Sequence, residues 1–273
     1  MDKRTLTQII ASIITNANLQ GFISGRIYRG KIKSLCVPGL NCYSCPGALG
    51  SCPIGSLQAV IGTAKYNISL YVLGLMGIFG ILFGRFICGW LCPFGFIQDL
   101  LHKIPSPKFK VPVKLNGTLK YFKYVVLSVF VVLLPLLLVD QLGLSSPYFC
   151  KYICPAGTLE GGIPLTLINR GLRAALGFLF IWKLVILLIV IVLSLLIYRP
   201  FCRYICPLGA FYALFNPFSY YGYKLDKEKC TGCGVCQNSC RLGLNPGETP
   251  NNPECIRCGE CLKSCPQGAI TRR

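Results

Sequence analysis

Two cysteine runs near the C-terminus, C-T-G-C-G-V-C-Q-N-S-C (Cys230–Cys240) and C-I-R-C-G-E-C-L-K-S-C-P (Cys255–Pro266), decide the fold of the last fifth of the chain. Each run has the spacing C-x2-C-x2-C-x3-C, in which three thiolates bind one four-iron cluster and the fourth binds the neighbouring cluster. We therefore predict two [4Fe–4S] clusters, as in a two-cluster bacterial ferredoxin. The expected ligands are Cys230, Cys233, Cys236 and Cys265 for the first cluster, and Cys255, Cys258, Cys261 and Cys240 for the second.

Structural zinc and disulfide bonds are the two other interpretations of these cysteines. Zinc sites usually combine two separated C-x2-C pairs rather than two runs of four cysteines. Closely spaced thiols of this kind are also more typical of metal ligands than of a disulfide framework. The first run has Arg241 where the second has Pro266, a departure that leaves the ligand set unchanged.

The composition favours a membrane protein. Of the residues, 53% are hydrophobic and only 14% are charged, against about a quarter in soluble domains, and the mean hydropathy is +0.57. The net charge of +19 is not accompanied by a nucleic-acid recognition motif, so we expect no nucleic-acid partner. Basic loops beside a membrane and near anionic clusters explain this charge better. Because no small-residue cleavage site follows the apolar stretch Ile9–Ile14, we expect no cleavable signal.

Four apolar stretches are candidates for membrane spans. The first contains several Asn and Gln residues and is either a weak span or an interfacial helix; a span is the preferred interpretation. The third should begin near Tyr121 and bend at Pro135, and the fourth contains Lys183, which can snorkel or face the bundle. The stretches are Leu6–Phe22, Ile68–Phe86, Val125–Val139 and Ala174–Tyr198.

A short repeat accompanies these stretches. Cys-Pro-x-Gly occurs four times, at Cys52, Cys92, Cys154 and Cys206, and in the last three copies another cysteine lies four residues earlier. Cysteines at i and i+4 share one helical face, so each pair can bind one metal centre. The proline can begin a helix, and the glycine permits a close approach of the backbone.

Alternation of the spans places these cysteines at two ends of the bundle, side A and side B. Side A has four, which suffice for one further [4Fe–4S] cluster: Cys88, Cys92, Cys202 and Cys206. Side B has six, if the first stretch spans: Cys36, Cys42, Cys45, Cys52, Cys150 and Cys154. The spacing leaves open which four of the six bind a cluster, and whether the surplus pair is a thiol/disulfide switch or ligates a smaller or shared centre.

The C-x3-C-P repeats joined to the double ferredoxin motif resemble membrane-bound [4Fe–4S] polyferredoxins, over roughly residues 65 to 273. The chain is similar to the NapH type, which is associated with quinol oxidation for periplasmic nitrate reductase, and to the membrane portion of NosR-type regulators. The resemblance supports the Cys88/Cys92 and Cys202/Cys206 pairs and the eight C-terminal cysteines as cluster ligands. A branch that serves extracytoplasmic flavoproteins or thiol reductases is an equal alternative.

We expect a mostly helical, polytopic membrane bundle in residues 1–219 and a two-[4Fe–4S] ferredoxin-like α+β domain in residues 220–273. The expected function is electron relay between a cytoplasmic donor or the quinone pool and a partner oxidoreductase, without catalytic residues. A quinol dehydrogenase or thiol/disulfide reductase, and a redox sensor or assembly factor, are the alternatives. The excess of Lys and Arg on side A predicts a cytoplasmic ferredoxin domain in the cell membrane.

Several polar residues have more than one interpretation. Arg85, Arg199 and Arg203 lie beside side A cysteines, and can either raise a cluster's potential or anchor the chain at the interface. The only histidine, His102, is expected at the interface, and a single histidine excludes a bis-His haem. The acids in the membrane part are expected to be caps or polar anchors: Asp99, Asp140 and Glu160.

Overall fold

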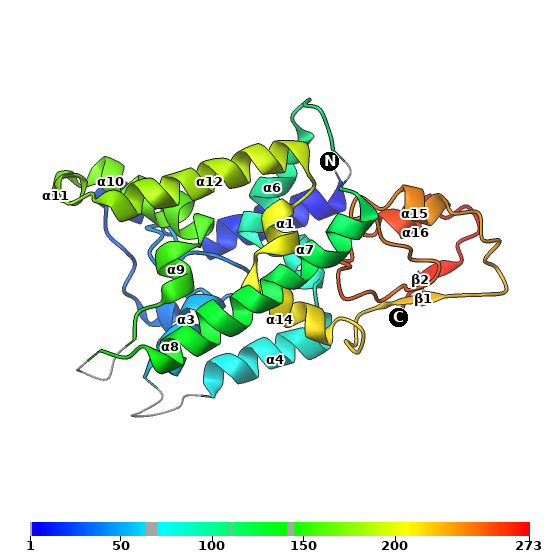
Figure 1. Ribbon diagram of the computed structural model, residues 1–273, viewed down its shortest axis with the longest axis horizontal. Coiled ribbons are helices and arrows are strands. Elements are labelled where there is room, and N and C mark those ends of the chain that lie inside the picture. The colour runs from blue at the N-terminus through cyan, green and yellow to red at the C-terminus, as the bar shows by residue number, and fades with distance from the viewer. Residues whose placement is uncertain (1, 64–69, 110, 141–144) are drawn as a thin grey trace.

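The computed structural model describes residues 2–63, 70–109, 111–140 and 145–273. Its apolar helices run along the long axis of the molecule, and the ferredoxin-like part forms one end (Figure 1). Three helices run in this direction. The first is α4 (Tyr71–Phe83) and the third is α12 (Phe178–Leu196). The second is a continuous helix made of α7 (Val113–Val126), η2 (Leu127–Leu133) and α8 (Leu134–Leu137). The middle helix contains a π-helical segment, η2, just before Pro135, the position where we expected a bend.

Two helices in the described part are long and apolar enough to cross a membrane, Lys114–Leu137 and Phe178–Leu196. In the most apolar 18-residue stretch of each helix, only 22% and 17% of the residues, respectively, are buried. A core helix of a soluble protein is mostly buried. Their large side chains therefore point outward. By length and composition, two of the four expected spans can thus cross a membrane, and the multi-pass bundle stays a prediction.

The other two expected spans differ from the prediction. The stretch Leu6–Phe22 is divided between α1 (Lys3–Thr15) and α2 (Leu19–Ser24), because the side chain of Asn18 turns away to donate to Pro46 O at 2.8 Å. The helix α4 has only 13 residues, and the expected start of its span at Ile68 lies outside the described residues.

The Cys-Pro-x-Gly repeat begins new helices. Cys52, Cys92 and Cys206 are the N-caps of α3 (Pro53–Gly62), α6 (Pro93–Lys103) and α14 (Pro207–Phe215), with proline in the first turn of each helix. The preceding cysteines lie on or beside separate short helices: α5 (Phe86–Trp90), α9 (Tyr148–Tyr152) and α13 (Pro200–Tyr204). The expectation that each pair shares one helical face is therefore wrong, because a break separates the two cysteines.

The remaining helices of the bundle are short. They are η1 (Lys31–Ser34), η3 (Gly157–Gly162), α10 (Ile163–Ile168) and α11 (Arg170–Ala174). In Figure 1, α3, α9, α10 and α11 lie at the end of the bundle away from the ferredoxin-like part. The side B cysteines before Pro53 belong to the loop that joins η1 to α3.

The ferredoxin-like part is a small α+β unit, as expected. Strand β1 (Tyr223–Leu225) pairs antiparallel with β2 (Ile270–Arg272), and Leu225 lies opposite Ile270. Two helical turns, α15 (Val235–Asn238) and α16 (Glu260–Ser264), carry cysteines of the two runs. Each turn follows a glycine at positive φ, +71° at Gly234 and +87° at Gly259, a conformation that other residues rarely adopt.

The ferredoxin-like part docks on the bundle through the segment before Cys258. A Cβ added to Gly89 would lie 2.2 Å from Ile256 O, so only glycine fits at this contact. Glu254 inserts between two buried cations, 2.6 Å from Arg85 Nη1 and 2.5 Å from Lys123 Nζ. Ile256 belongs to the same buried core as the side A cysteines. The domain boundary that we expected between residues 219 and 220 stays a prediction, and residues on both sides of it belong to this core.

Candidate iron–sulfur sites

The eight ferredoxin cysteines form two groups of four. The first lines a cavity of about 210 Å³ at the exposed tip, and we call it the outer ferredoxin group: Cys230, Cys233, Cys236 and Cys265. The second lines a pocket beside Tyr198 of the bundle, and we call it the inner ferredoxin group: Cys240, Cys255, Cys258 and Cys261. These are the sets expected from the sequence, and their role as ligands stays a prediction.

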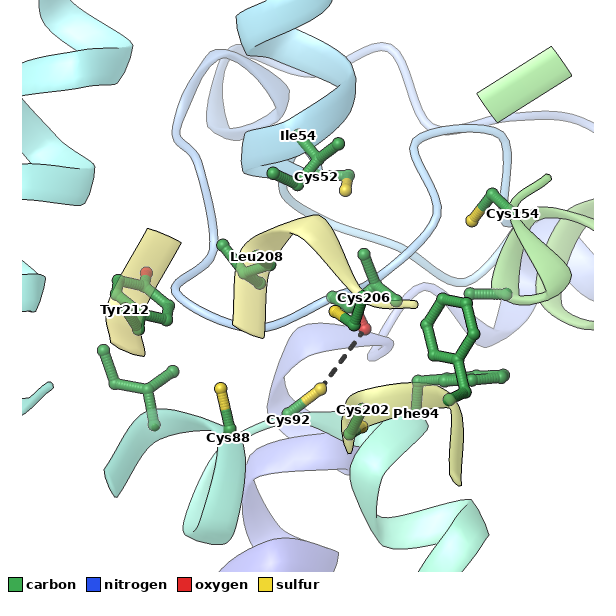
Figure 2. Packing of buried hydrophobic residues seen from close by; sticks show 14 of the residues in the cluster. Cys52, Ile54, Cys88, Cys92, Phe94, Cys154, Cys202, Cys206, Leu208 and Tyr212 are labelled. Atoms are coloured by element: carbon green, nitrogen blue, oxygen red, sulfur yellow. Dashed lines mark hydrogen bonds between the residues drawn. The ribbon is translucent and has the colours of Figure 1, made fainter. Parts of the chain in front are cut away.

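A third group lies where the ferredoxin-like part meets the bundle, and we call it the junction group: Cys88, Cys92, Cys202 and Cys206. Figure 2 shows these four cysteines around the gap between the segments of α5–α6 and α13–α14. All four are at most 5% exposed. Burial raises the pKa of Cys92, Cys202 and Cys206, and the charges of Cys88 and other members of the group raise it further. The pKa of Cys202 reaches about 11.

Backbone and side-chain donors point at the sulfurs of the junction group. Gly95 N and Gly209 N each lie 3.4 Å from the Sγ of the cysteine that caps their helix, Cys92 and Cys206. The Gln98 amide donates through Nε2 to Cys202 Sγ at 3.0 Å. Two helix N-termini and an amide therefore favour negative charge on these sulfurs.

Arg85 and Arg199 connect the two segments that carry the junction group, because each arginine donates to a backbone carbonyl of the other segment. Arg85 Nη2 donates to Cys202 O at 3.0 Å, and Arg199 Nη1 donates to Cys88 O at 2.5 Å. Both side chains are at most 2% exposed, so the alternative of interfacial anchoring is wrong for these two arginines. Arg203 is also buried, and it donates to Leu242 O of the ferredoxin-like part at 2.7 Å.

Asp99 balances part of this charge. It accepts from Arg199 at 2.6 and 2.5 Å, from Gln8 at 2.9 Å, and from Arg4. Burial raises the pKa of Asp99, but Arg199 and Arg4 outweigh it and hold the pKa at about 2. Asp99 is therefore a buried ion-pair partner within α6 rather than a helix cap.

A fourth group lies farther from the ferredoxin-like part, around a cavity of about 530 Å³. We call it the distal group: Cys42, Cys52, Cys150 and Cys154. Burial and neighbouring charges raise the pKa of Cys42, Cys52 and Cys150 to about 12. Lys183 lines the same cavity and donates to Cys150 O at 3.1 Å, so it faces the bundle rather than snorkelling.

The other two side B cysteines have separate surroundings. Cys45 donates from Sγ to Asn16 Oδ1 at 3.5 Å, and Cys36 lies in a bridge with Ser51. Neither is among the residues of the described chain that line the distal cavity. None of the eighteen cysteines forms a disulfide bond in the structure.

The outer, inner and distal groups each line a cavity. Among the described residues, no three His, Cys, Asp or Glu side chains are close enough to share one metal ion. A four-iron cluster spreads its thiolate ligands around a cube of atoms, so four cysteines set farther apart than the ligands of a single zinc ion would suit this cofactor.

Four side chains share one signal, a position six residues after the cysteine of a Cys-Pro-x-Gly copy, and the sequence analysis missed three of them: Gln58, Gln98 and Tyr212. Gln58 and Gln98 donate to cysteine sulfurs at 3.3 and 3.0 Å. Glu160 accepts from Cys42 N at 2.6 Å, and Tyr212 donates to Pro38 O at 3.0 Å. Burial raises the pKa of Glu160 to about 8.

Of the remaining polar candidates, His102 lines the same pocket as Cys240 of the inner ferredoxin group. His102 is half-buried, with Nδ1 3.2 Å from Ser194 O, and burial lowers its pKa. Asp140 is exposed at the end of the helix that contains α8. The structure gives neither residue a contact with a cysteine of the four groups.

Comparison with protein families finds iron–sulfur domains in both parts of the chain. A 4Fe-4S binding domain model matches residues 64–112, 124–163 and 179–219, which contain three of the cysteine pairs. A second 4Fe-4S binding domain model matches residues 250–271. No solved structure matches the chain.

Three relatives illustrate the range of similar proteins. Uncharacterized protein MJ0750 of Methanocaldococcus jannaschii is 30% identical over 71% of this chain and 74% of its own length. Methylamine utilization ferredoxin-type protein MauN of Methylorubrum extorquens is 28% identical over 87% and 73%. Regulatory protein NosR of Stutzerimonas stutzeri is 26% identical over 59% of this chain, but only 21% of its own. The chain spans about half the length of a further curated relative.

Proposed function

Because the chain belongs to the NosR-type polyferredoxin family, we propose that it is a membrane-embedded iron–sulfur protein that relays electrons between redox partners. The observation that carries this proposal is the order of the cysteine groups. The outer ferredoxin group lies at an exposed tip, the inner group packs on the bundle, and the junction group is buried between apolar helices. A bound [4Fe–4S] cluster supplies one-electron redox chemistry at such a site.

The donor sets support this cofactor at three positions. The outer and inner ferredoxin groups and the junction group each bring four cysteines together. The residues of the junction group are buried among Ile87, Phe94 and Phe201, which exclude water. Exclusion of water and nearby charge are the means by which a protein sets the potential of a cluster.

The surrounding residues are suited to anionic groups. Arg85 and Arg199 place two buried guanidinium groups next to the junction cysteines, each fixed by an acid and a cysteine carbonyl. These cations stabilise added negative charge, so their side chains favour the reduced state of the site. The arginines thus hold the cysteine pairs in place and tune them.

The outward apolar faces support a membrane location. On α12, the large side chains Ile181, Val185 and Leu188 are 48–62% exposed. Soluble monomers rarely expose so continuous an apolar surface. We propose a multi-pass protein of the cell membrane with the ferredoxin domain on the cytoplasmic side, and a redox protein or a quinone as partner.

Electron transfer across vesicles tests this function. The full chain would be placed in liposomes that enclose ferricyanide, with dithionite added outside under anaerobic conditions. We expect ferricyanide bleaching well above that of protein-free liposomes, and its loss in Cys88→Ala and Cys202→Ala. Cys36→Ala, which lies outside the four groups, is the matched control and should retain the rate. Bleaching at the protein-free rate, or an unaffected Cys88→Ala, would contradict the proposal.

A further inference from the structure

We propose that the distal group, Cys42, Cys52, Cys150 and Cys154, binds a fourth [4Fe–4S] cluster, and that Cys36 and Cys45 are not ligands. This assignment rests on the proposed function and deepens it. All four distal cysteines line one cavity of about 530 Å³ between the loop before α3 and the segment of α9. The assignment selects four of the six side B cysteines, a choice that the sequence spacing leaves open.

The first argument is that the distal and junction groups are built by the same contacts. In the junction group, Gln98 donates from Nε2 to Cys202 Sγ at 3.0 Å and accepts from Phe201 N at 3.2 Å. In the distal group, Gln58 donates from Nε2 to Cys150 Sγ at 3.3 Å and accepts from Phe149 N at 2.9 Å. Each glutamine lies six residues after a Cys-Pro-x-Gly cysteine.

This correspondence pairs the cysteines one by one. Cys52 takes the place of Cys92, and Cys150 and Cys154 take the places of Cys202 and Cys206. The place of Cys88 is left for one more cysteine. Cys42 fills it, because it lines the cavity with the other three and its backbone N–H is held by Glu160 at 2.6 Å.

The second argument is a positive charge at the cavity. Lys183 belongs to α12, the most apolar helix, where a charged side chain is costly unless it has a partner. Its Nζ contacts Cys150 O and would lie 3.6 Å from a Cβ on Gly157. A four-thiolate cluster is anionic and would supply this partner. Lys183 would then serve the distal group as the arginines serve the junction group.

The third argument is the space in front of two glycines. A Cβ added to Gly55 would lie 3.8 Å from Cys150 Sγ, and one added to Gly157 would lie 3.8 Å from Cys42 Sγ. Both are the glycine of a Cys-Pro-x-Gly copy, so their missing side chains leave the centre of the cavity open. Cys45 instead donates from Sγ to Asn16 Oδ1, and neither Cys36 nor Cys45 is among the described residues that line the cavity.

Iron and acid-labile sulfide per chain test the assignment on full-length protein purified without oxygen. We expect about sixteen irons in the wild type, and about twelve in Cys52→Ala and Cys150→Ala, with the EPR signals of the other clusters retained. Cys36→Ala and Cys45→Ala are the matched controls and should keep about sixteen. Loss of about four irons in either control, or unchanged iron in Cys52→Ala, overturns the assignment.

A variant that keeps every cysteine controls for misfolding caused by the loss of a cysteine. Gly157→Leu fills the cavity, and we expect it to lose the same four or so irons while the ferredoxin EPR signals persist. If it keeps all of its iron, the cavity is not the cluster site. A wild type with about sixteen irons but no transfer across vesicles would contradict the proposed function alone. One with about twelve that transfers electrons would contradict the distal cluster alone.

Discussion

At the scale of single residues, the position six residues after each Cys-Pro-x-Gly cysteine determines what the buried sulfurs contact. Gln58 and Gln98 use this position to donate to a sulfur of the other segment, while Glu160 and Tyr212 use it to fix a loop. Hydrogen bonds to cluster sulfurs stabilise the more negative, reduced state. The two glutamines should therefore set the potentials of two different groups.

Replacement of Gln98 by leucine tests this role. Because the variant removes the donor to Cys202 Sγ, we expect the potential of the junction cluster to become more negative, while the ferredoxin potentials stay unchanged. A redox titration monitored by EPR measures this shift. Gln58→Leu is the matched control, since its amide serves Cys150 instead. Equal shifts of every cluster in both variants would show a general structural effect.

Asp99 is the second residue for which we expect a definite effect of substitution, here on stability. Removing one partner of a buried ion pair costs about 3–5 kcal/mol, so Asp99→Asn should lower the stability by that order. The lowered pKa of Asp99, about 2, means that its contribution is complete above the unfolded pKa and is lost as the pH falls toward 2. The difference between wild type and variant should therefore be constant between about pH 6 and 8.

Thermal loss of the cluster absorbance measures this effect. Asp2→Asn is the control, because Asp2 forms an exposed pair with Lys263, and such pairs contribute at most about 1 kcal/mol. A difference between wild type and Asp99→Asn that changes across the neutral range would show that the carboxylate titrates there, against the expectation.

At the scale of elements, the docking of the ferredoxin-like part depends on the close approach of α5 to the loop before Cys258. Trp90 Nε1 donates to Arg257 O at 2.9 Å, and the Arg257 side chain donates to Phe83 O at 2.8 Å. Gly89 lies at the tightest point of this contact. The contact joins residues directly before Cys258 of the inner ferredoxin group to the residue that follows Cys88 of the junction group.

Gly89→Ala should loosen this contact. The added Cβ would clash with Ile256 O, and overpacking of this kind typically costs about 1–3 kcal/mol. We expect limited proteolysis to release the ferredoxin-like part faster, and electron transfer to the junction group to slow. Gly74→Ala on α4 is the control, because a Cβ there meets nothing within 4 Å. Equal proteolysis of the two variants would contradict the role of Gly89.

The sequence predicted some elements well because their signals are local. The ferredoxin runs carry their whole ligand pattern within a few residues, and the two long apolar helices follow from composition alone. The distal group was not predictable, because four loop cysteines at irregular spacing offered several sets and only the path of the loop chooses Cys42 and Cys52. The break at Asn18 was missed because it arises from a contact with Pro46, which is distant in the sequence.

At the scale of the whole molecule, α15 and α16, which carry ferredoxin cysteines, lie at one end, and α3 and α9, which border the distal group, lie toward the other end of the bundle (Figure 1). If α12 spans the membrane, the chain ends on either side of it face different compartments. This arrangement would take electrons past an apolar core about 30 Å thick.

Reporter fusions test this placement. Fused after Arg273, green fluorescent protein should fluoresce and alkaline phosphatase should be inactive, since we expect the ferredoxin domain in the cytoplasm. Fused after Asn169, at the other end of α12, the two reporters should give the opposite result. The same reporter active at both positions would exclude α12 as a span.

The crosswise hydrogen bonds of Arg85 and Arg199 bear on the ancestry of the junction group. Each arginine lies three residues before the first cysteine of its own segment and donates to the carbonyl of the other segment's first cysteine. Two copies of a chain half as long, each with one Arg-x2-Cys-x3-Cys-Pro unit, would satisfy the same bonds about a two-fold axis. Duplication and fusion of such a gene would preserve these bonds and leave other positions free to differ between the halves, such as Gln98 and Tyr212, which contact different partners.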